Sequence, residues 1–188
     1  MLKPNFLLSL LLVSLAVVFV GCSTQTSNSQ PGSSAADVTK TSRSVNVGTA
    51  IGDSAPEFEL TTLDGATVTL ASLKSQPAVL VFWTAWCPVC KEEAPYINQL
   101  AASFEPRGVR VLGVNIQDSL ARTEGGIRDF GIRYSVARDA NASVARRYKV
   151  TGTPTIIFLD KSGTIRYFGN ELPDDYPARL DVLLNESG

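Results

Sequence analysis

Two cysteines separated by two residues carry the strongest chemical signal in the sequence. Cys87 and Cys90 follow an apolar run, rich in β-branched and aromatic residues, that begins at Val79 and predicts a buried strand. If Cys87 caps the helix that follows, Pro88 occupies the first helical position, where its missing N–H costs nothing and its fixed φ suits the helix. Residues three apart on a helix are about 5 to 6 Å apart, which is close enough for a disulfide. The spacing therefore predicts a dithiol that opens and closes without movement of the fold.

The predicted helix start makes the two sulfurs chemically different. Cys87 would face free backbone N–H groups and the positive end of the helix dipole, which stabilise a thiolate and lower its pKa below the usual value of about 8.5. Cys90, inside the helix and against the apolar strand, is expected to be more buried and more often protonated. We therefore predict that Cys87 is the nucleophile and that Cys90 resolves the mixed disulfide.

Two other interpretations of the cysteine pair are a zinc site and a purely structural disulfide. A four-ligand zinc site needs more donors than the sequence offers, because it contains no histidine and only one further cysteine, Cys22. A structural disulfide usually closes a longer loop, since the entropic gain grows with loop length. We therefore favour redox chemistry and predict neither a bound metal nor a cofactor.

Residues 1–22 have the pattern of an export signal. Lys3 supplies positive charge, residues 6–20 are almost purely apolar, and Gly21-Cys22 follows at once. The apolar run is shorter than the roughly 20 residues of a membrane-spanning helix, which favours a cleaved signal. Residues 19–22 resemble a bacterial lipoprotein box, in which the cysteine is lipidated and becomes the new N-terminus. A free periplasmic protein and an uncleaved anchor are the alternatives.

Residues 23–50 differ in composition from the rest of the chain, because they are rich in Ser, Thr, Gln, Asn, Gly and Ala. Such a segment cannot bury enough apolar surface to offset the entropy lost on ordering. We predict a flexible tether that holds the following domain off a membrane surface, with an extension that has no role as the alternative. Residues 51–188 have the size of one domain. The 17 basic and 18 acidic residues nearly balance, so no basic patch indicates nucleic acid.

Hydrophobic periodicity and turn residues predict an α/β domain. Asp64-Gly65 marks the turn of a leading hairpin, residues 71–74 are expected to form a short turn, and Gly125-Gly126 weakens a predicted helix by roughly 1 kcal/mol per glycine. The strand, helix, strand order around the cysteines requires a parallel pair with a right-handed crossover. The predicted strands are 58–60, 67–70, the run from 79, 109–116, 134–137, 155–159 and 164–168, and the predicted helices are 88–104, 119–130, 142–148 and 174–184.

Three groups of residues, taken in order, resemble a known family. Trp86-Cys87-Pro88-Val89-Cys90-Lys91, Pro95 five places after the second cysteine, and Gly152-Thr153-Pro154-Thr155 before an apolar strand resemble the thioredoxin fold. The hairpin and the long segment 118–150 between the two halves are similar to the membrane-attached TlpA/ResA-like branch, which is related to the AhpC/TSA redoxins. The resemblance implies a thioredoxin-like fold over 51–188, with a central mixed sheet, flanking helices, an N-terminal β-hairpin and a central strand/helix insertion.

The same resemblance implies an extracytoplasmic, membrane-anchored thiol-disulfide oxidoreductase. TlpA/ResA-like proteins reduce or exchange disulfides outside the cytoplasmic membrane, often on apocytochrome c, whose haem-binding cysteines must be reduced before haem attaches. The implied partners are proteins with dithiols or disulfides, an electron donor in the membrane and, through Cys22, the membrane itself. The direction of electron flow stays open, because stabilising the thiolate makes the disulfide more oxidising.

By analogy with the family, the Thr153–Pro154 bond is cis and faces the cysteine pair. It would present the backbone of Thr153 to a substrate strand and, lacking an N–H, leave the sulfurs without a competing donor. An ordinary trans proline at the start of a strand is the alternative. Trp86, at the exit of the central strand, is expected to form the contact surface for substrate together with Pro88 and Val89.

One family feature is missing. Thioredoxins carry a buried Asp on the central strand, and ResA-like proteins carry a Glu late in the first hairpin strand. Val81 and Thr61 hold these two places here, so the usual proton acceptor for the resolving thiol is absent from both. Glu59, on the leading hairpin, is a candidate to assist deprotonation of Cys90. A solvated carboxylate without such a role is the alternative, because Glu is mostly exposed in proteins.

Two further function classes share this fold. A peroxiredoxin-type thiol peroxidase needs a peroxide-activating Thr three residues before its nucleophile, and Thr84 holds that position. The adjacent resolving Cys90 argues against this alternative. Copper chaperones of this fold pair a wider-spaced cysteine motif with a histidine, and the chain lacks both, although a dithiol can bind Cu(I).

Overall fold

The structure is a computed structural model and describes residues 46–186. One sheet contains seven strands: β1 (Glu59–Thr62), β2 (Thr67–Thr69), β3 (Ala78–Trp83), β4 (Arg110–Ile116), β5 (Ser135–Asp139), β6 (Thr155–Leu159) and β7 (Ile165–Gly169). Their order across the sheet is β2-β1-β5-β4-β3-β6-β7. β3 and β4 are parallel, as are β4 and β5, whereas the other neighbours are antiparallel. The predicted mixed sheet is therefore confirmed.

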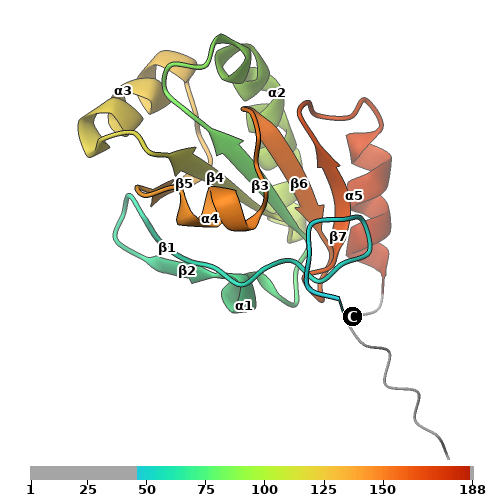
Figure 1. The fold of residues 1–188 in the computed structure, drawn as a ribbon. Coiled ribbons are helices and arrows are strands. Elements are labelled where there is room, and N and C mark those ends of the chain that lie inside the picture. The colour runs from blue at the N-terminus through green and yellow to red at the C-terminus, as the bar shows by residue number, and fades with distance from the viewer. Residues whose placement is uncertain (1–45, 187–188) are drawn as a thin grey trace, which may run out of the picture. The chain divides into compact units, whose positions relative to one another are not determined.

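Helices cover both faces of the sheet. They are α1 (Leu70–Leu73), α2 (Pro88–Phe104), a 3₁₀ turn (Glu105–Arg107), α3 (Leu120–Phe130), α4 (Ser143–Arg147) and α5 (Tyr176–Asn185). Residues of α1 and α4 pack with Leu80 and Phe82 in one apolar cluster. Residues of α2, α3 and α5 pack with Val81 and Trp83 in a second cluster, on the other side of β3. Figure 1 shows these layers on either side of the sheet.

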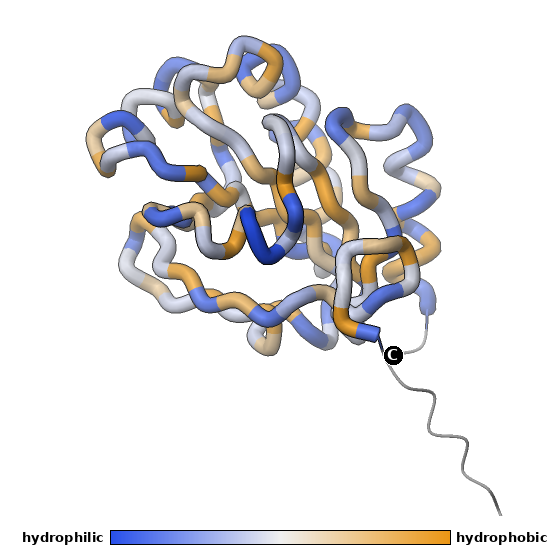
Figure 2. Tube along the Cα trace, in the orientation of Figure 1, coloured by the Kyte–Doolittle hydropathy of each residue, from blue (hydrophilic) through white to orange (hydrophobic). Residues whose placement is uncertain are grey.

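β3 is buried along its whole length, because the two apolar clusters cover both of its faces. A strand buried on both faces has a continuous apolar sequence, and this pattern is what predicted it. Figure 2 shows hydrophobic residues along the central strands and hydrophilic residues on loops and outer helix faces. β3 ends at Trp83 and α2 begins at Pro88, so the cysteines lie at the carboxyl end of the central strand.

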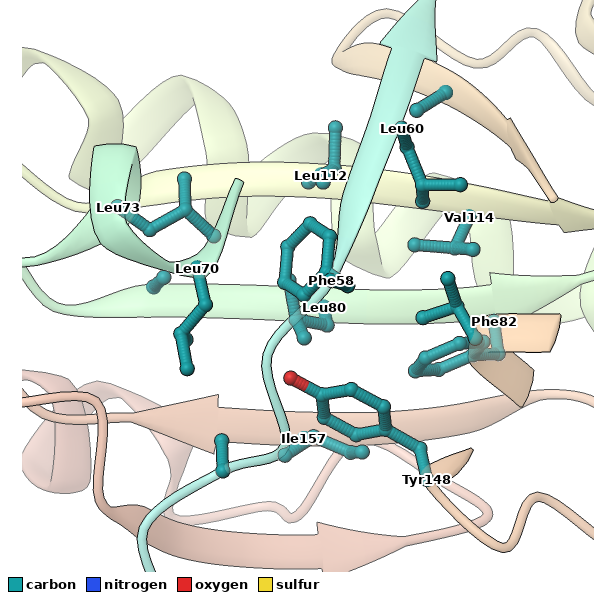
Figure 3. Close-up of a cluster of buried hydrophobic side chains, with 14 of the residues drawn as sticks. Phe58, Leu60, Leu70, Leu73, Leu80, Phe82, Leu112, Val114, Tyr148 and Ile157 are labelled. Atoms are coloured by element: carbon teal, nitrogen blue, oxygen red, sulfur yellow. The ribbon is translucent and has the colours of Figure 1, made fainter. Parts of the chain in front are cut away.

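Tyr148, directly after α4, anchors one of the apolar clusters. Its ring centroid lies 6.1 Å from that of Phe58 and 5.6 Å from that of Phe82, and Figure 3 shows the three rings together. The hydroxyl donates to Pro56 O at 2.8 Å. Burial, and then the charge of Glu57, raise the pKa of Tyr148 far above its usual range. The neutral hydroxyl therefore remains a donor that ties the segment before β1 to the end of α4.

The predicted insertion between the two halves of the fold is confirmed. α3, β5 and α4 lie between β4 and β6 in the sequence, and β5 joins the sheet beside β4. β1 and β2 form the predicted hairpin, but β1 also pairs with β5. The hairpin therefore extends the main sheet and does not merely precede it.

The prediction of a short turn at residues 71–74 was wrong, because the chain forms the one-turn helix α1 there. Thr69 and Ser72 cap this helix reciprocally: the Ser72 N–H donates to Thr69 Oγ1 at 3.0 Å, and the Thr69 N–H donates to Ser72 Oγ at 2.9 Å. Leu70 and Leu73 are buried on its inner side. Two caps and two buried leucines are enough to stabilise a single helical turn.

The predicted signal (1–22) and most of the predicted tether (23–50) lie outside the described residues. The described part of the tether, residues 46–50, contacts the domain: the Ser54 N–H donates to Asn46 O at 2.9 Å, and the Gly48 N–H donates to Ser54 O at 3.0 Å. These residues therefore pack as part of the domain. Within residues 46–186, no helix is both long and apolar enough to cross a membrane.

Candidate active site

Cys87 caps α2, as the sequence predicts. Its backbone is extended, with φ −86° and ψ 111°, and Pro88 takes the first helical position. The Cys90 N–H donates to Cys87 Sγ at 3.1 Å, and the two cysteines form a disulfide with their Cα atoms 5.3 Å apart. After reduction, the amide and the positive end of the helix dipole both favour a thiolate on Cys87.

Both cysteines are almost fully buried, with 4% of Cys87 and 5% of Cys90 exposed. This equal burial differs from the expectation that Cys90 is the more buried of the two. The cause is the loop around Thr153, whose carbonyl oxygen lies 3.2 Å from Cys87 Sγ. Trp86 and Val89 border the pair and are 68% and 52% exposed. They form an apolar rim through which a partner protein can approach the sulfurs.

The Thr153–Pro154 peptide bond is cis, as the family resemblance implies. Hydrogen bonds brace the loop on both sides of it. Thr155 Oγ1 donates to Gly152 O at 2.7 Å, and Asn170 Nδ2 donates to Pro154 O at 2.8 Å. The loop therefore places a fixed backbone edge against the dithiol.

Glu93 lies near Cys90, and the sequence analysis missed it. Both residues, together with Tyr134, line a cavity of about 10 Å³. Glu93 Oε1 accepts the Leu172 N–H at 2.6 Å, which fixes the carboxylate. Burial, and then the charge of Glu93, raise the pKa of Tyr134 far above its usual range. The signal was available in the sequence, because Glu93 follows Cys90 by three residues and so shares its face of the helix.

Glu59 lies away from the dithiol. It is exposed on β1, opposite Thr69 of β2. β5 and β4 separate β1 from β3, and three strand spacings amount to roughly 14 Å. This placement argues against the hypothesis that Glu59 assists Cys90, because proton transfer needs a hydrogen bond or one bridging water.

A buried polar network, also missed in the sequence, holds the loop between β3 and α2. Asp118 Oδ2 accepts the Ala85 N–H at 2.7 Å and a hydrogen from Asn115 Nδ2 at 2.9 Å. Thr123 Oγ1 in turn donates to Asn115 Oδ1 at 2.7 Å. All three side chains are buried, and each has the partners that burial requires. The network connects α3 to a residue two positions before Cys87.

Most of the predicted site residues come together at the start of α2. The dithiol, its rim and the cis-proline loop gather there: Cys87, Cys90, Trp86, Pro88, Val89, Thr153 and Pro154. Cys22 lies outside the described residues.

A dithiol that caps a helix at the end of a central strand, opposite a cis-proline, is the arrangement of thioredoxin-fold redox proteins. The protein is a thiol-disulfide oxidoreductase of this class. It belongs to the AhpC/TSA family, whose sequence model matches residues 51–168. The thiol-disulfide oxidoreductase ResA of Geobacillus kaustophilus is 32% identical over 136 residues, which cover 71% of this chain and 78% of that protein. The TlpA/ResA resemblance seen in the sequence is therefore confirmed.

Similar solved structures support the assignment of the chain to thioredoxin-fold oxidoreductases. A secreted Mycobacterium tuberculosis disulfide oxidoreductase, homologous to E. coli DsbE, is 32% identical with a TM-score of 0.59, over 66% of this chain and 95% of that one. M. tuberculosis DsbF, solved in mixed oxidised and reduced forms, is 31% identical with a TM-score of 0.61, over 68% and 95% of the two chains. The predicted thioredoxin-like fold is confirmed.

Proposed function

We propose that this oxidoreductase is a lipid-tethered reductant of protein disulfides outside the cytoplasmic membrane, acting through Cys87-Pro88-Val89-Cys90. The observation that carries the proposal is the position of Cys87 Sγ, which accepts the Cys90 N–H in the first turn of α2 and lies against the cis-proline loop. A thiolate there is stabilised where a substrate strand can meet it. The exposed Trp86 beside it suits a protein substrate better than a small one.

The reaction has two exchange steps. The Cys87 thiolate attacks one sulfur of a substrate disulfide, that S–S bond breaks, and one substrate sulfur leaves as a thiolate. Cys90 then loses its proton and attacks Cys87 Sγ, which releases the second substrate thiolate. The dithiol has passed two electrons to the substrate and has become the Cys87–Cys90 disulfide. A dithiol donor in the membrane would reduce it again.

We infer that Glu93 accepts the proton of Cys90 in the second step. Its carboxylate lines the same small cavity as Cys90 and is held by the Leu172 N–H. Val81, which takes the place of the thioredoxin Asp, lines that cavity too and cannot accept a proton. Glu93 is therefore the one carboxylate among the described residues that line this cavity with Cys90.

Glu93→Gln is expected to slow release of the mixed disulfide about tenfold at neutral pH, a change equivalent to about one pKa unit. The amide keeps an oxygen for the Leu172 N–H but accepts no proton, so the pH at which release is half-maximal should rise. The measurement is stopped-flow release of a substrate thiol across pH. Glu92→Gln, at an exposed position on the same helix, is the matched control. Equal pH profiles for the two variants would remove Glu93 from the mechanism.

The tether and the substrate class come from the sequence and from the relatives. Residues 1–22 have the pattern of a lipoprotein signal that ends at Cys22, and 23–50 that of a spacer. The M. tuberculosis relative is a secreted protein. The TlpA/ResA resemblance suggests apocytochrome c as a substrate, because its cysteines must be reduced before haem attaches.

Incubation of the reduced protein with disulfide-bonded apocytochrome c tests the function. We expect loss of the substrate disulfide to match formation of the Cys87–Cys90 disulfide, as followed by alkylation and mass spectrometry, and an equilibrium against glutathione that favours the oxidised protein. In cells, Cys22→Ser should move the protein from the membrane fraction to the soluble fraction. A pair that stays reduced in a glutathione buffer would identify an oxidant and overturn the proposed direction.

A further inference from the structure

A groove beside the dithiol has no role in the chemistry above. Its volume is about 530 Å³, within the range of roughly 300 to 1,000 Å³ that is typical of ligand sites. Trp86 and Thr153 line it near the cysteines, and Arg122 of α3 and Arg146 of α4 line it as well. Because Thr153 O lies 3.2 Å from Cys87 Sγ, a polypeptide in this groove would lead directly to the nucleophile.

The charge of the groove is positive. Arg122 and Arg146 are exposed, and within residues 46–186 neither forms an ion pair with a carboxylate. Arg146 Nη1 donates to Asn141 O at 2.8 Å, which uses one of its five donors. Asp118, the one carboxylate among the described lining residues, is buried and its Oδ2 already accepts two N–H groups. The two guanidinium groups are therefore available to an anionic ligand.

The backbone around the groove is held in uncommon conformations. Gln117 and Ala142 both line the groove and have positive φ angles of 58° and 55°. Lys149, next to the lining residue Val150, has φ 53°. Residues other than glycine rarely adopt these angles, and such conformations concentrate at ligand sites.

We propose that the groove binds the substrate polypeptide next to the attacked cysteine and selects substrates with a carboxylate side chain within a few residues of it. This inference rests on the proposed function. Trp86 offers an aromatic surface to the bound chain, while Arg122 and Arg146 bind the carboxylate through charge-assisted hydrogen bonds. An extended chain advances about 3.3 Å per residue, so only residues close to the cysteine reach the arginines.

The test uses peptides that differ at one position. Each contains one cysteine as a mixed disulfide with 2-thiopyridine, a neutral leaving group, and Glu, Gln or Lys at a chosen position before or after it. The reduced full-length protein should react with the best-placed Glu peptide about three- to tenfold faster than with its Gln partner, and most slowly with Lys. Added salt should reduce this preference.

The double substitution Arg122→Gln, Arg146→Gln should abolish the preference, so that the Glu and Gln peptides react at equal rates. Arg128→Gln, an exposed arginine of α3 outside the groove, is the matched control and should keep the preference. Equal rates for the three peptides at every position, or a preference that survives the double substitution, would overturn the proposal. A wild-type protein that reacts with none of the peptides would overturn the proposed function itself, and the groove proposal with it.

Discussion

Replacement of Cys87 with serine is expected to abolish disulfide reduction, with a loss of about 10³-fold or more in rate. The thiolate is the nucleophile in disulfide exchange, and Cys87 Sγ is the sulfur that accepts the Cys90 N–H at the helix start. Serine is a good N-cap residue, so α2 should still form and the lost activity would come from lost chemistry. The measurement is the rate of apocytochrome c reduction, with the thermal unfolding midpoint as the check on folding.

Cys90→Ser separates the two roles. Cys87 can still attack, but no neighbouring thiol releases the product, so covalent protein–substrate pairs should accumulate in a ratio of one to one. Non-reducing electrophoresis and mass spectrometry would detect them and locate the bond at Cys87. A folded Cys90→Ser variant that traps nothing, or alkylation that labels Cys90 before Cys87 in the reduced wild type at neutral pH, would falsify the assigned roles. Rapid consumption of peroxide by the wild type would instead favour a thiol peroxidase with Thr84 in the site.

The parts of the site that depend on local sequence could be predicted. The helix cap at Cys87 could be predicted from Pro88 and from the three-residue spacing of the cysteines. Where a helix starts depends mainly on the residue types at its cap and first turn, which are adjacent in the sequence. β3 could be predicted for a similar reason, since a strand buried on both faces has an unbroken apolar sequence. Local signals also mislead, however. Ser72 completes a capping box that more often contains Glu or Gln, and the helix α1 was therefore missed.

The parts that depend on how distant segments pack could not be predicted in this way. Glu59 was proposed because the sequence does not show that β5 lies between the hairpin and β4. The position of Glu93 relative to Cys90 depends only on helical spacing, but its contact with the Leu172 N–H joins residues 79 positions apart. The Asp118 network likewise connects residues that are brought together only by the sheet. A single sequence contains no direct signal for such contacts.

Gly126 is another residue whose contribution to stability is visible only from the packing of the structure. From the sequence alone, Gly125 and Gly126 are equivalent, because each is expected to lower the stability of the helix by the same amount. In the structure, a Cβ added to Gly126 would lie 2.8 Å from both Ala85 Cβ and Trp83 Cζ3, whereas one added to Gly125 would meet its nearest neighbour, the end of Arg128, at 3.9 Å. Trp83 is buried and Ala85 is held by the Asp118 network. Neither can move away at low cost.

Gly126→Ala is therefore expected to lower the free energy of unfolding by about 1 to 3 kcal/mol, because overpacking outweighs the gain in helix propensity. Gly125→Ala, its matched control, should raise the free energy of unfolding by up to about 1 kcal/mol. Urea denaturation of the two variants measures both changes.

The close approach of Gly126 to Ala85 also connects this packing to the chemistry. Relief of the clash would shift the loop that ends at Cys87, so Gly126→Ala should slow disulfide exchange even at urea concentrations where the variant remains folded. Gly125→Ala should exchange at the wild-type rate. If Gly126→Ala proves as stable and as active as Gly125→Ala, then α3 does not set the position of the loop, and the Asp118 hydrogen bond to the Ala85 N–H must hold it without help from helix packing.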